Sequence, residues 1–140
     1  MDKREISRIF EEVGLLLELK GESPFKSKAY YNAARTIETL TEDVGDLVAS
    51  GRIRELKGIG QALAGKLAEL VGTGRLAYYD ELRQSVPAGL LEMTTIPGLG
   101  PKKITTVWNQ LGITTVGELE YACIVNRLVG LPGFGQKSQD

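Results

Sequence analysis

The chain has 140 residues, of which 42% are hydrophobic and 25% charged, and its formal net charge at pH 7 is −1. It is long enough for one modest core or two small subdomains, and too apolar for a disordered chain. With no histidine and one cysteine, it excludes Ser-His-Asp triads, Cys-His pairs, side-chain zinc sites and internal disulfides. No signal peptide or membrane span is expected, and the single cysteine fits a reducing, cytoplasmic setting.

Apolar residues follow a helical spacing along nearly the whole chain. Between residues 6 and 17 they recur at the i, i+3, i+4 and i+7 positions of one buried helix face. Ser23 and Pro24 have the residue types of an N-cap and a first helical position, so they predict the start of a second helix. A third, short helix is expected through "DVGDLVAS", ending at Gly51. Because no period-2 alternation bounded by turns appears, we predict an all-α fold.

A last helix is predicted near the C-terminal end. Thr115 and Glu118 form the ends of the capping box "TVGE", which should open a helix through "LEYACIV". Cys123 lies within this apolar run and is expected to be a small buried side chain.

An internal repeat is the most informative feature of the chain. The pattern apolar-x-Gly-apolar-Gly occurs three times, with first glycines at Gly58, Gly98 and Gly133. No third glycine follows at the spacing of a dinucleotide-binding fold, and no Gly-Lys-Ser/Thr closes a P-loop. The repeat therefore predicts helices joined by glycine turns.

Such a turn can bind phosphate without a basic side chain. Glycine accepts φ > 0 and allows close approach, so the turn and the next helix N-terminus can direct N–H groups at one phosphate. A chain of net charge −1 could thereby bind the DNA backbone with little reading of bases. Lys102 and Lys103, just after the second turn, should add counterion release. The alternative is that each turn only makes a tight connection between two helices. Three copies with the same apolar pattern favour the phosphate-binding interpretation over this alternative.

Basic and aromatic residues gather in "PFKSKAYYNAAR", a stretch without any acid. Lys26 and Lys28 lie beside Tyr30 and Tyr31, so contact with DNA is favoured over a plain solvated face. One of the two tyrosines is expected in the core.

The hairpins resemble the helix-hairpin-helix motifs of DNA repair proteins, and the whole chain resembles the N-terminal region of a bacterial family X DNA polymerase, the family of DNA polymerase beta. The most specific stretches are "KAYYNAARTI" (28–37), "LKGIGQALAGKLAELVGTGRL" (56–76) and "LGITTVGELEYA" (111–122). The resemblance implies a lyase-like subdomain over residues 1–83, with the first hairpin. It also implies a fingers-like subdomain over residues 84–140, with the second hairpin and a truncated third.

The resemblance implies a lyase that removes 5′-deoxyribose phosphate, in which a lysine amine forms a Schiff base with the sugar aldehyde and permits β-elimination. It places Lys66 at the nucleophile, Lys26 at a 5′-phosphate ligand and Tyr30 at the pocket tyrosine. Ala62 stands where the vertebrate pocket has an assisting lysine, so less positive charge surrounds the amine and slow turnover is expected. A solvated lysine on a helix face is the alternative interpretation of Lys66.

The resemblance also implies a DNA interface and cation sites at the hairpins. The implied partner is DNA with a gap or a 5′-phosphate. The turn residues implied to contact it are Gly58, Ile59, Gly60, Gly98, Leu99, Gly100, Gly133 and Gly135. A monovalent cation, Na⁺ or K⁺, is implied in each complete hairpin, held by the backbone carbonyls of Arg54, Leu56 and Ile59 or of Thr94, Ile96 and Leu99. No tightly bound small-molecule cofactor is expected, and the chain is expected to be a monomer.

In bacterial members of that family, a third hairpin leads into the polymerase palm, which holds the divalent metal ions. The palm carboxylates are expected downstream of this chain, which we interpret as a fragment whose residues 136–140 should be frayed. Two classes of function remain open. One is the DNA-binding region of a repair polymerase, with lyase activity; the other is a non-catalytic helix-hairpin-helix adaptor that binds DNA or a partner protein.

Overall fold

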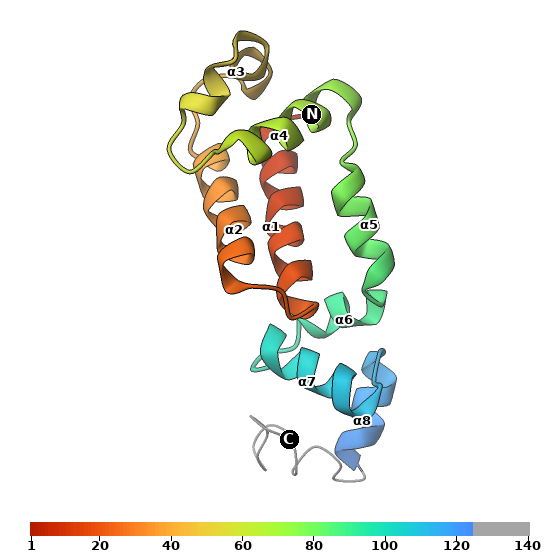
Figure 1. Cartoon of the computed structure of the whole chain (residues 1–140). Helices are drawn as coiled ribbons and strands as arrows, with labels where there is room; N and C mark the ends of the chain where they lie inside the picture. Colours follow the sequence, from red (N-terminus) through yellow and green to blue (C-terminus); the bar gives the residue numbers. More distant parts are fainter. Residues whose placement is uncertain (125–140) are drawn as a thin grey trace.

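The structure, a computed structural model, describes residues 1–124. Within them every regular element is helical, as the apolar spacing predicted (Figure 1). The elements are α1 (Lys3–Leu19), α2 (Pro24–Glu38), α3 (Val44–Ser50), the 3₁₀ helix η1 (Arg52–Glu55), α4 (Gln61–Thr73), α5 (Ala77–Ser85), α6 (Ala88–Met93), α7 (Pro101–Leu111) and α8 (Val116–Ile124). None of these helices is long and apolar enough to cross a membrane. The third glycine turn, with Gly133 and Gly135, and the predicted fraying of residues 136–140 lie outside the described residues.

The ends of the early helices follow their capping residues. The Ser23 hydroxyl accepts a hydrogen bond of 3.3 Å from the Phe25 N–H, and Pro24 begins α2. Gly51 ends α3 in the left-handed conformation, with φ 78°, which glycine adopts without a steric penalty. Both predicted boundaries are therefore confirmed.

The predicted capping box at α8 forms with one difference. The Thr115 hydroxyl accepts from the Glu118 N–H at 3.1 Å, as expected. The Glu118 carboxylate, however, accepts from the backbone N–H of Thr114 at 3.3 Å, one residue before the predicted donor, and this bond lowers the pKa of Glu118. Cys123 in the same helix is only partly buried.

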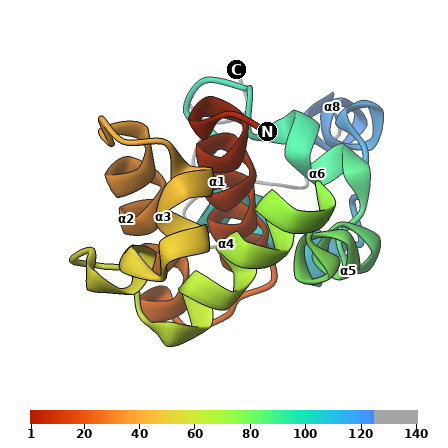
Figure 2. The ribbon, with the colours of Figure 1, turned by 90° about the horizontal axis from the view of Figure 1, so that it is seen from above.

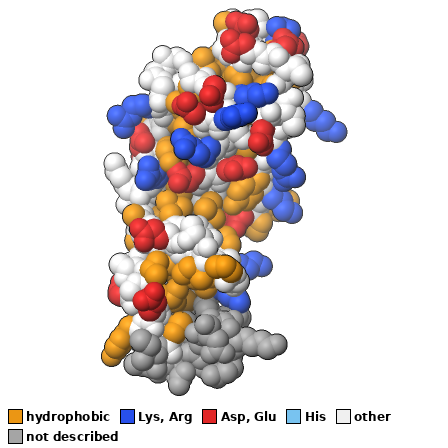
Figure 3. Space-filling view, turned by 180° about the vertical axis from the view of Figure 1, so that it is seen from behind, with side chains coloured by type: hydrophobic (Ala, Val, Ile, Leu, Met, Phe, Trp, Pro, Cys, Tyr) orange, Lys and Arg blue, Asp and Glu red, His pale blue; other side chains and the backbone are white. Residues whose placement is uncertain are grey.

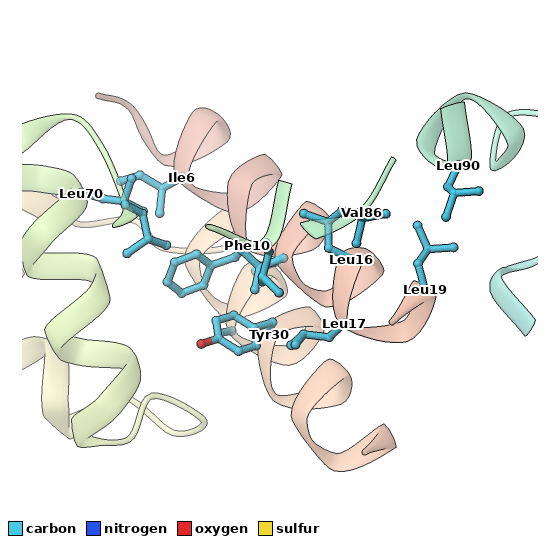
Figure 4. Close-up of a cluster of buried hydrophobic side chains, with 14 of the residues drawn as sticks. Ile6, Phe10, Leu16, Leu17, Leu19, Tyr30, Leu70, Val86 and Leu90 are labelled. Carbon is cyan, nitrogen blue, oxygen red and sulfur yellow. The ribbon is translucent and has the colours of Figure 1, made fainter. Parts of the chain in front are cut away.

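The core is built around α1. Seen from above, α2, α4 and α5 lie around this helix (Figure 2), and its apolar face is fully buried at Ile6, Phe10 and Val13. Figure 4 shows the Phe10 ring beside Tyr30, and Leu19 pointing toward Leu90 of α6.

The second half of the described chain packs on the C-terminal end of α1. Leu90, Ile104 and Val107 are fully buried in the same hydrophobic cluster as the α1 residues, and the Thr105 hydroxyl of α7 donates to the Leu19 carbonyl at 3.0 Å. The two predicted subdomains thus share one core, and a boundary after residue 83, inside α5, stays a prediction.

The buried tyrosine makes the fold sensitive to alkali. Tyr30 is 8% exposed, and burial raises its pKa above the ordinary value of 10. Because the folded pKa exceeds the unfolded one, this contribution to stability is complete below about pH 10 and is lost as the pH rises toward the folded pKa. The expected slope is up to about 1.4 kcal/mol per pH unit for one such group.

Urea unfolding between about pH 9 and pH 11 measures this slope. The variant Tyr30→Phe should show a shallower decline than the parent chain. Tyr121→Phe serves as the control, because Tyr121 is 62% exposed. Equal slopes in the parent and Tyr30→Phe would show that Tyr30 is not the responsible group.

Candidate functional site

The two glycine turns within the described residues share one backbone geometry. In the first, the Leu56 carbonyl accepts a hydrogen bond of 3.1 Å from the Ile59 N–H, and Gly58 between them has φ 89°. The second turn repeats this bond at 3.1 Å, with φ 81° at Gly98. A positive φ at the third turn position is typical of a type II turn and favours glycine. The sequence repeat is therefore also a structural repeat.

The second glycine of each turn directly precedes a helix. Gly60 before α4 and Gly100 before α7 are extended, with φ −80° and −84°, and neither helix has a side-chain cap. Ile59 and Leu99, between the glycines, are 3% and 8% exposed and hold the turns on the core, whereas the glycines are exposed. The first N–H groups of both helices therefore face solvent or a ligand, as a phosphate site requires.

The carbonyls implied for a monovalent cation lie around the same turns. Leu56 and Ile96 each use their carbonyl for the turn hydrogen bond, which leaves a second lone pair for an ion. Arg54 lies in η1 and Thr94 ends α6. A cation at these carbonyls stays a prediction. Across residues 1–124, no group of three or more acidic, cysteine or histidine side chains could hold a metal ion.

The basic residues after the second turn differ in their contacts. Lys103 donates from Nζ to the Gly98 carbonyl at 3.4 Å, so it lies over the turn that it was predicted to assist. Lys102 is exposed.

Lys66 lies at the end of a row of three aromatic rings. Its Nζ is 4.9 Å from the ring centroid of Tyr78, which stacks on Tyr30 with centroids 6.0 Å apart and an interplanar angle of 22°. Tyr30 in turn meets Phe10 edge to face at 5.6 Å. A ring face attracts a nearby ammonium group, so Tyr78 holds the Lys66 amine above the core.

Lys26 joins this group through Glu22. The two side chains form an ion pair of 3.9 Å and are 61% and 42% exposed. Burial and then the charge of Glu22 raise the pKa of Tyr78, which places Glu22 near that phenol. The structure therefore brings the predicted residues Lys66, Tyr30 and Lys26 into one region.

Local contacts of the α4–α5 turn position Tyr78. Gly74 ends α4 in the left-handed conformation, and the Thr73 hydroxyl accepts from the Arg75 N–H at 3.2 Å. The Glu69 carboxylate then accepts from the Ala77 N–H at 2.7 Å, at the start of α5. These bonds fix the connection between α4, which carries Lys66, and the start of α5, which carries Tyr78.

Sequence reasoning missed Tyr78 and Glu22. The pair Tyr78-Tyr79 in the sequence was the available signal. The contact of Tyr78 with Lys66, however, depends on how α5 packs. Tyr30, predicted to contact DNA, is 8% exposed and offers a ligand little surface. Ala62, at the position of the assisting lysine in the vertebrate pocket, is exposed.

The surface carries no continuous basic field on the face drawn in Figure 3. Lys and Arg are interspersed with Asp and Glu over its upper part (Figure 3), in agreement with the net charge of −1. With so small a net charge, phosphate binding is expected to depend on local groups.

Comparison with protein families identifies the repeat. Residues 1–76 match the model described as a helix-hairpin-helix domain. The chain belongs to the helix-hairpin-helix domain family. Residues 90–139 match a second model, described as a SAM-like helix-hairpin-helix tandem, so each turn described above lies in a matched segment. The prediction of an all-α fold built on helix-hairpin-helix motifs is confirmed.

A curated relative extends the match over the whole helix-hairpin-helix chain. The chain is 34% identical over 140 residues to "DNA polymerase/3'-5' exonuclease PolX" of Bacillus subtilis (strain 168), an alignment that covers 100% of this chain and 24% of the relative. The predicted resemblance to a family X DNA polymerase is confirmed. The chain spans about a quarter of that relative's length.

Proposed function

We propose that this chain is a DNA-binding region of a family X repair polymerase. The observation that carries the proposal is the repeated turn, in which Gly58 and Gly98 have φ of 89° and 81° and an uncapped helix follows. Similarity to a relative named as a DNA polymerase supports it. Each hairpin contributes amide N–H groups to one phosphate of the sugar-phosphate backbone.

A contact of Lys26 with a 5′-phosphate would make the chain prefer DNA with a gap. Lys26 binds the 5′-phosphate at the gap after it exchanges its ion pair with Glu22, which is exposed and 3.9 Å long. Pairs of this kind contribute only about 0.3–0.5 kcal/mol, so the exchange costs little. A gapped duplex with a 5′-phosphate should therefore bind more tightly than an intact duplex.

Neutralising the lysines after the second turn tests the backbone-binding mode. The double variant Lys102→Gln/Lys103→Gln should bind two unrelated DNA sequences more weakly by the same factor. The slope of log affinity against log salt should fall by about 0.9 for each phosphate that the protein no longer neutralises. Fluorescence anisotropy at several salt concentrations measures both.

Arg4→Gln is the control, because Arg4 lies near the N-terminal end of α1, at the opposite end of the molecule from α7 (Figure 1). Weaker binding on one sequence only would indicate base readout and oppose the proposal.

A second activity, 5′-deoxyribose-phosphate lyase, is favoured by the contact of Lys66 with Tyr78 at 4.9 Å. The neutral amine adds to the C1′ aldehyde, and loss of water gives the Schiff base. Removal of a C2′ proton then breaks the C3′–O bond and releases the DNA strand with its 5′-phosphate. Hydrolysis of the remaining Schiff base restores the amine. Tyr78 orients the amine but supplies no positive charge, so turnover is slow.

Borohydride trapping on a 5′-deoxyribose-phosphate substrate tests the lyase. The covalent adduct should disappear in Lys66→Ala and persist in Lys57→Ala, a lysine on the exposed first turn. Tyr78→Phe keeps the ring and should keep the adduct, whereas Tyr78→Ala should slow trapping several-fold. No adduct with the parent chain, or an adduct that survives Lys66→Ala, would favour the alternative of a non-catalytic adaptor.

A further inference from the structure

A cavity of about 530 Å³ lies where the first turn of α7 meets the turn between α1 and α2. One wall comes from the end of α1 and the start of α2, and the other comes from the first two turns of α7. The Thr105 hydroxyl, which donates to the Leu19 carbonyl at 3.0 Å, fixes the two walls to each other. The cavity is therefore built into the contact between the two halves of the described chain.

In the described part of the chain, the lysines of this cavity have no ion-pair partner, whereas each of its carboxylates interacts with another side chain. Lys28 of α2 and Lys102 of α7 both line it, and within residues 1–124 neither forms an ion pair. Glu22 pairs with Lys26 at 3.9 Å. Glu18 interacts with the Tyr31 hydroxyl and, after burial, raises the pKa of that tyrosine. These contacts do not remove the two negative charges, so Lys28 and Lys102 are the positive groups that an anion in the cavity would contact.

Two helix N-termini also open at this cavity. Pro24 and Pro101, the first residues of α2 and α7, both line it. The helices have 15 and 11 residues, so each presents a partial positive charge at this end. An anion between them would interact favourably with both dipoles.

A buried hydroxyl group gives an independent indication of a ligand. Ser27 lines the cavity and is 2% exposed. Its Oγ is the buried side-chain polar atom that lacks a hydrogen-bond partner among the described residues. Leaving such a hydroxyl unsatisfied is unfavourable, and a phosphate oxygen in the cavity would accept a hydrogen bond from it.

We propose that this cavity binds one internal phosphate of a DNA strand, held from opposite walls by Lys28 and Lys102. The inference rests on the proposed DNA binding and deepens it, because a single phosphate would join the two hairpin-bearing halves of the chain. The second glycine turn directly precedes α7, so the same continuous strand reaches the turn amides and then the cavity. The terminal 5′-phosphate is a separate group, assigned to Lys26.

A salt-dependence cycle tests whether the two lysines share a phosphate. The variants are Lys28→Gln, Lys102→Gln and their combination, measured on one duplex at several salt concentrations. A shared phosphate predicts that the slope of log affinity against log salt falls by about 0.9 in total for the double variant. Two separate phosphates would lower the slope by about 1.8 and would overturn the inference.

The control pair is Lys28→Gln with Lys57→Gln, because Lys57 lies on the exposed first turn and Lys102 still neutralises the cavity phosphate; the slope of this pair should equal that of Lys57→Gln alone. A parent chain that does not bind DNA would refute the proposed function itself. A parent chain that binds, with the larger fall in slope for the double variant, would refute only the shared phosphate.

Two further comparisons identify the source of the phosphate and the role of Ser27. The affinity of the Lys28→Gln/Lys102→Gln variant should fall by the same factor on gapped DNA with a 5′-hydroxyl and with a 5′-phosphate; a fall confined to the phosphorylated DNA would contradict an internal phosphate. Ser27→Ala should raise the melting temperature without DNA, since an unsatisfied hydroxyl is removed, and weaken DNA binding several-fold. Unchanged DNA affinity in Ser27→Ala would contradict the proposal.

Discussion

Replacing Gly89 by alanine is expected to destabilise the chain by about 3 kcal/mol. A Cβ at this position of α6 would overlap the Thr114 carbonyl oxygen and lie 2.9 Å from its carbonyl carbon and 3.0 Å from the Thr115 Cα. These are backbone atoms ahead of α8, so relief requires α6 and α8 to separate. Overpacking of this kind typically costs about 1–3 kcal/mol and occasionally more. We expect the upper end of this range here, because the clash is with backbone atoms.

Urea unfolding of Gly89→Ala against Gly65→Ala measures this effect. Gly65 lies within α4 with nothing within 4 Å of its added Cβ, so alanine there should stabilise by about 0.5–1 kcal/mol. Equal stability of Gly89→Ala and the parent chain would show that α6 and the Thr114 backbone are not in close contact.

The second large effect is expected on DNA binding, from alanine at the positive-φ glycines of the hairpins. Gly98 has φ 81° and nothing within 4 Å of its added Cβ, so alanine fits the space but strains the backbone by about 1–2 kcal/mol. The turn relieves this strain by changing conformation, which redirects its N–H groups. Affinity should fall about tenfold for Gly98→Ala or Gly58→Ala, and about a hundredfold for both.

Gly112→Ala is the matched control for these variants. Gly112 has φ 66° and also nothing within 4 Å of its added Cβ, but it ends α7 and lies outside the turns. The variant Gly112→Ala should carry a comparable backbone strain and leave the affinity for DNA unchanged. A fall in affinity as large in Gly112→Ala as in Gly98→Ala would mean that general destabilisation, and not turn geometry, weakens binding.

Features set by neighbouring residues could be predicted from the sequence. Ser23 and Pro24 define the start of α2 because a cap and a first-position proline act within one turn. Gly58 and Gly98 define the turns because few other residues adopt positive φ.

Features that depend on packing between helices could not be predicted. Tyr78 reaches Lys66 through the placement of α5, to which the bond from the Ala77 N–H to the Glu69 carboxylate contributes, and no local sequence pattern encodes that bond. Tyr30 and Tyr31 are adjacent in the sequence, yet only Tyr30 lies in the core row with Phe10. The cavity between Lys28 and Lys102 likewise exists only once α7 has packed against α1.

The central claim is that backbone N–H groups of the two hairpins bind DNA phosphates, and titration of the ¹⁵N-labelled chain with duplex DNA, followed by NMR, tests it most directly. The largest shifts are predicted at the amides of Gly58, Gly60, Gly98 and Gly100 and in the first turns of α4 and α7, with the same pattern for unrelated DNA sequences. Shifts confined to other elements, with the hairpin amides unmoved at saturation, would contradict the account.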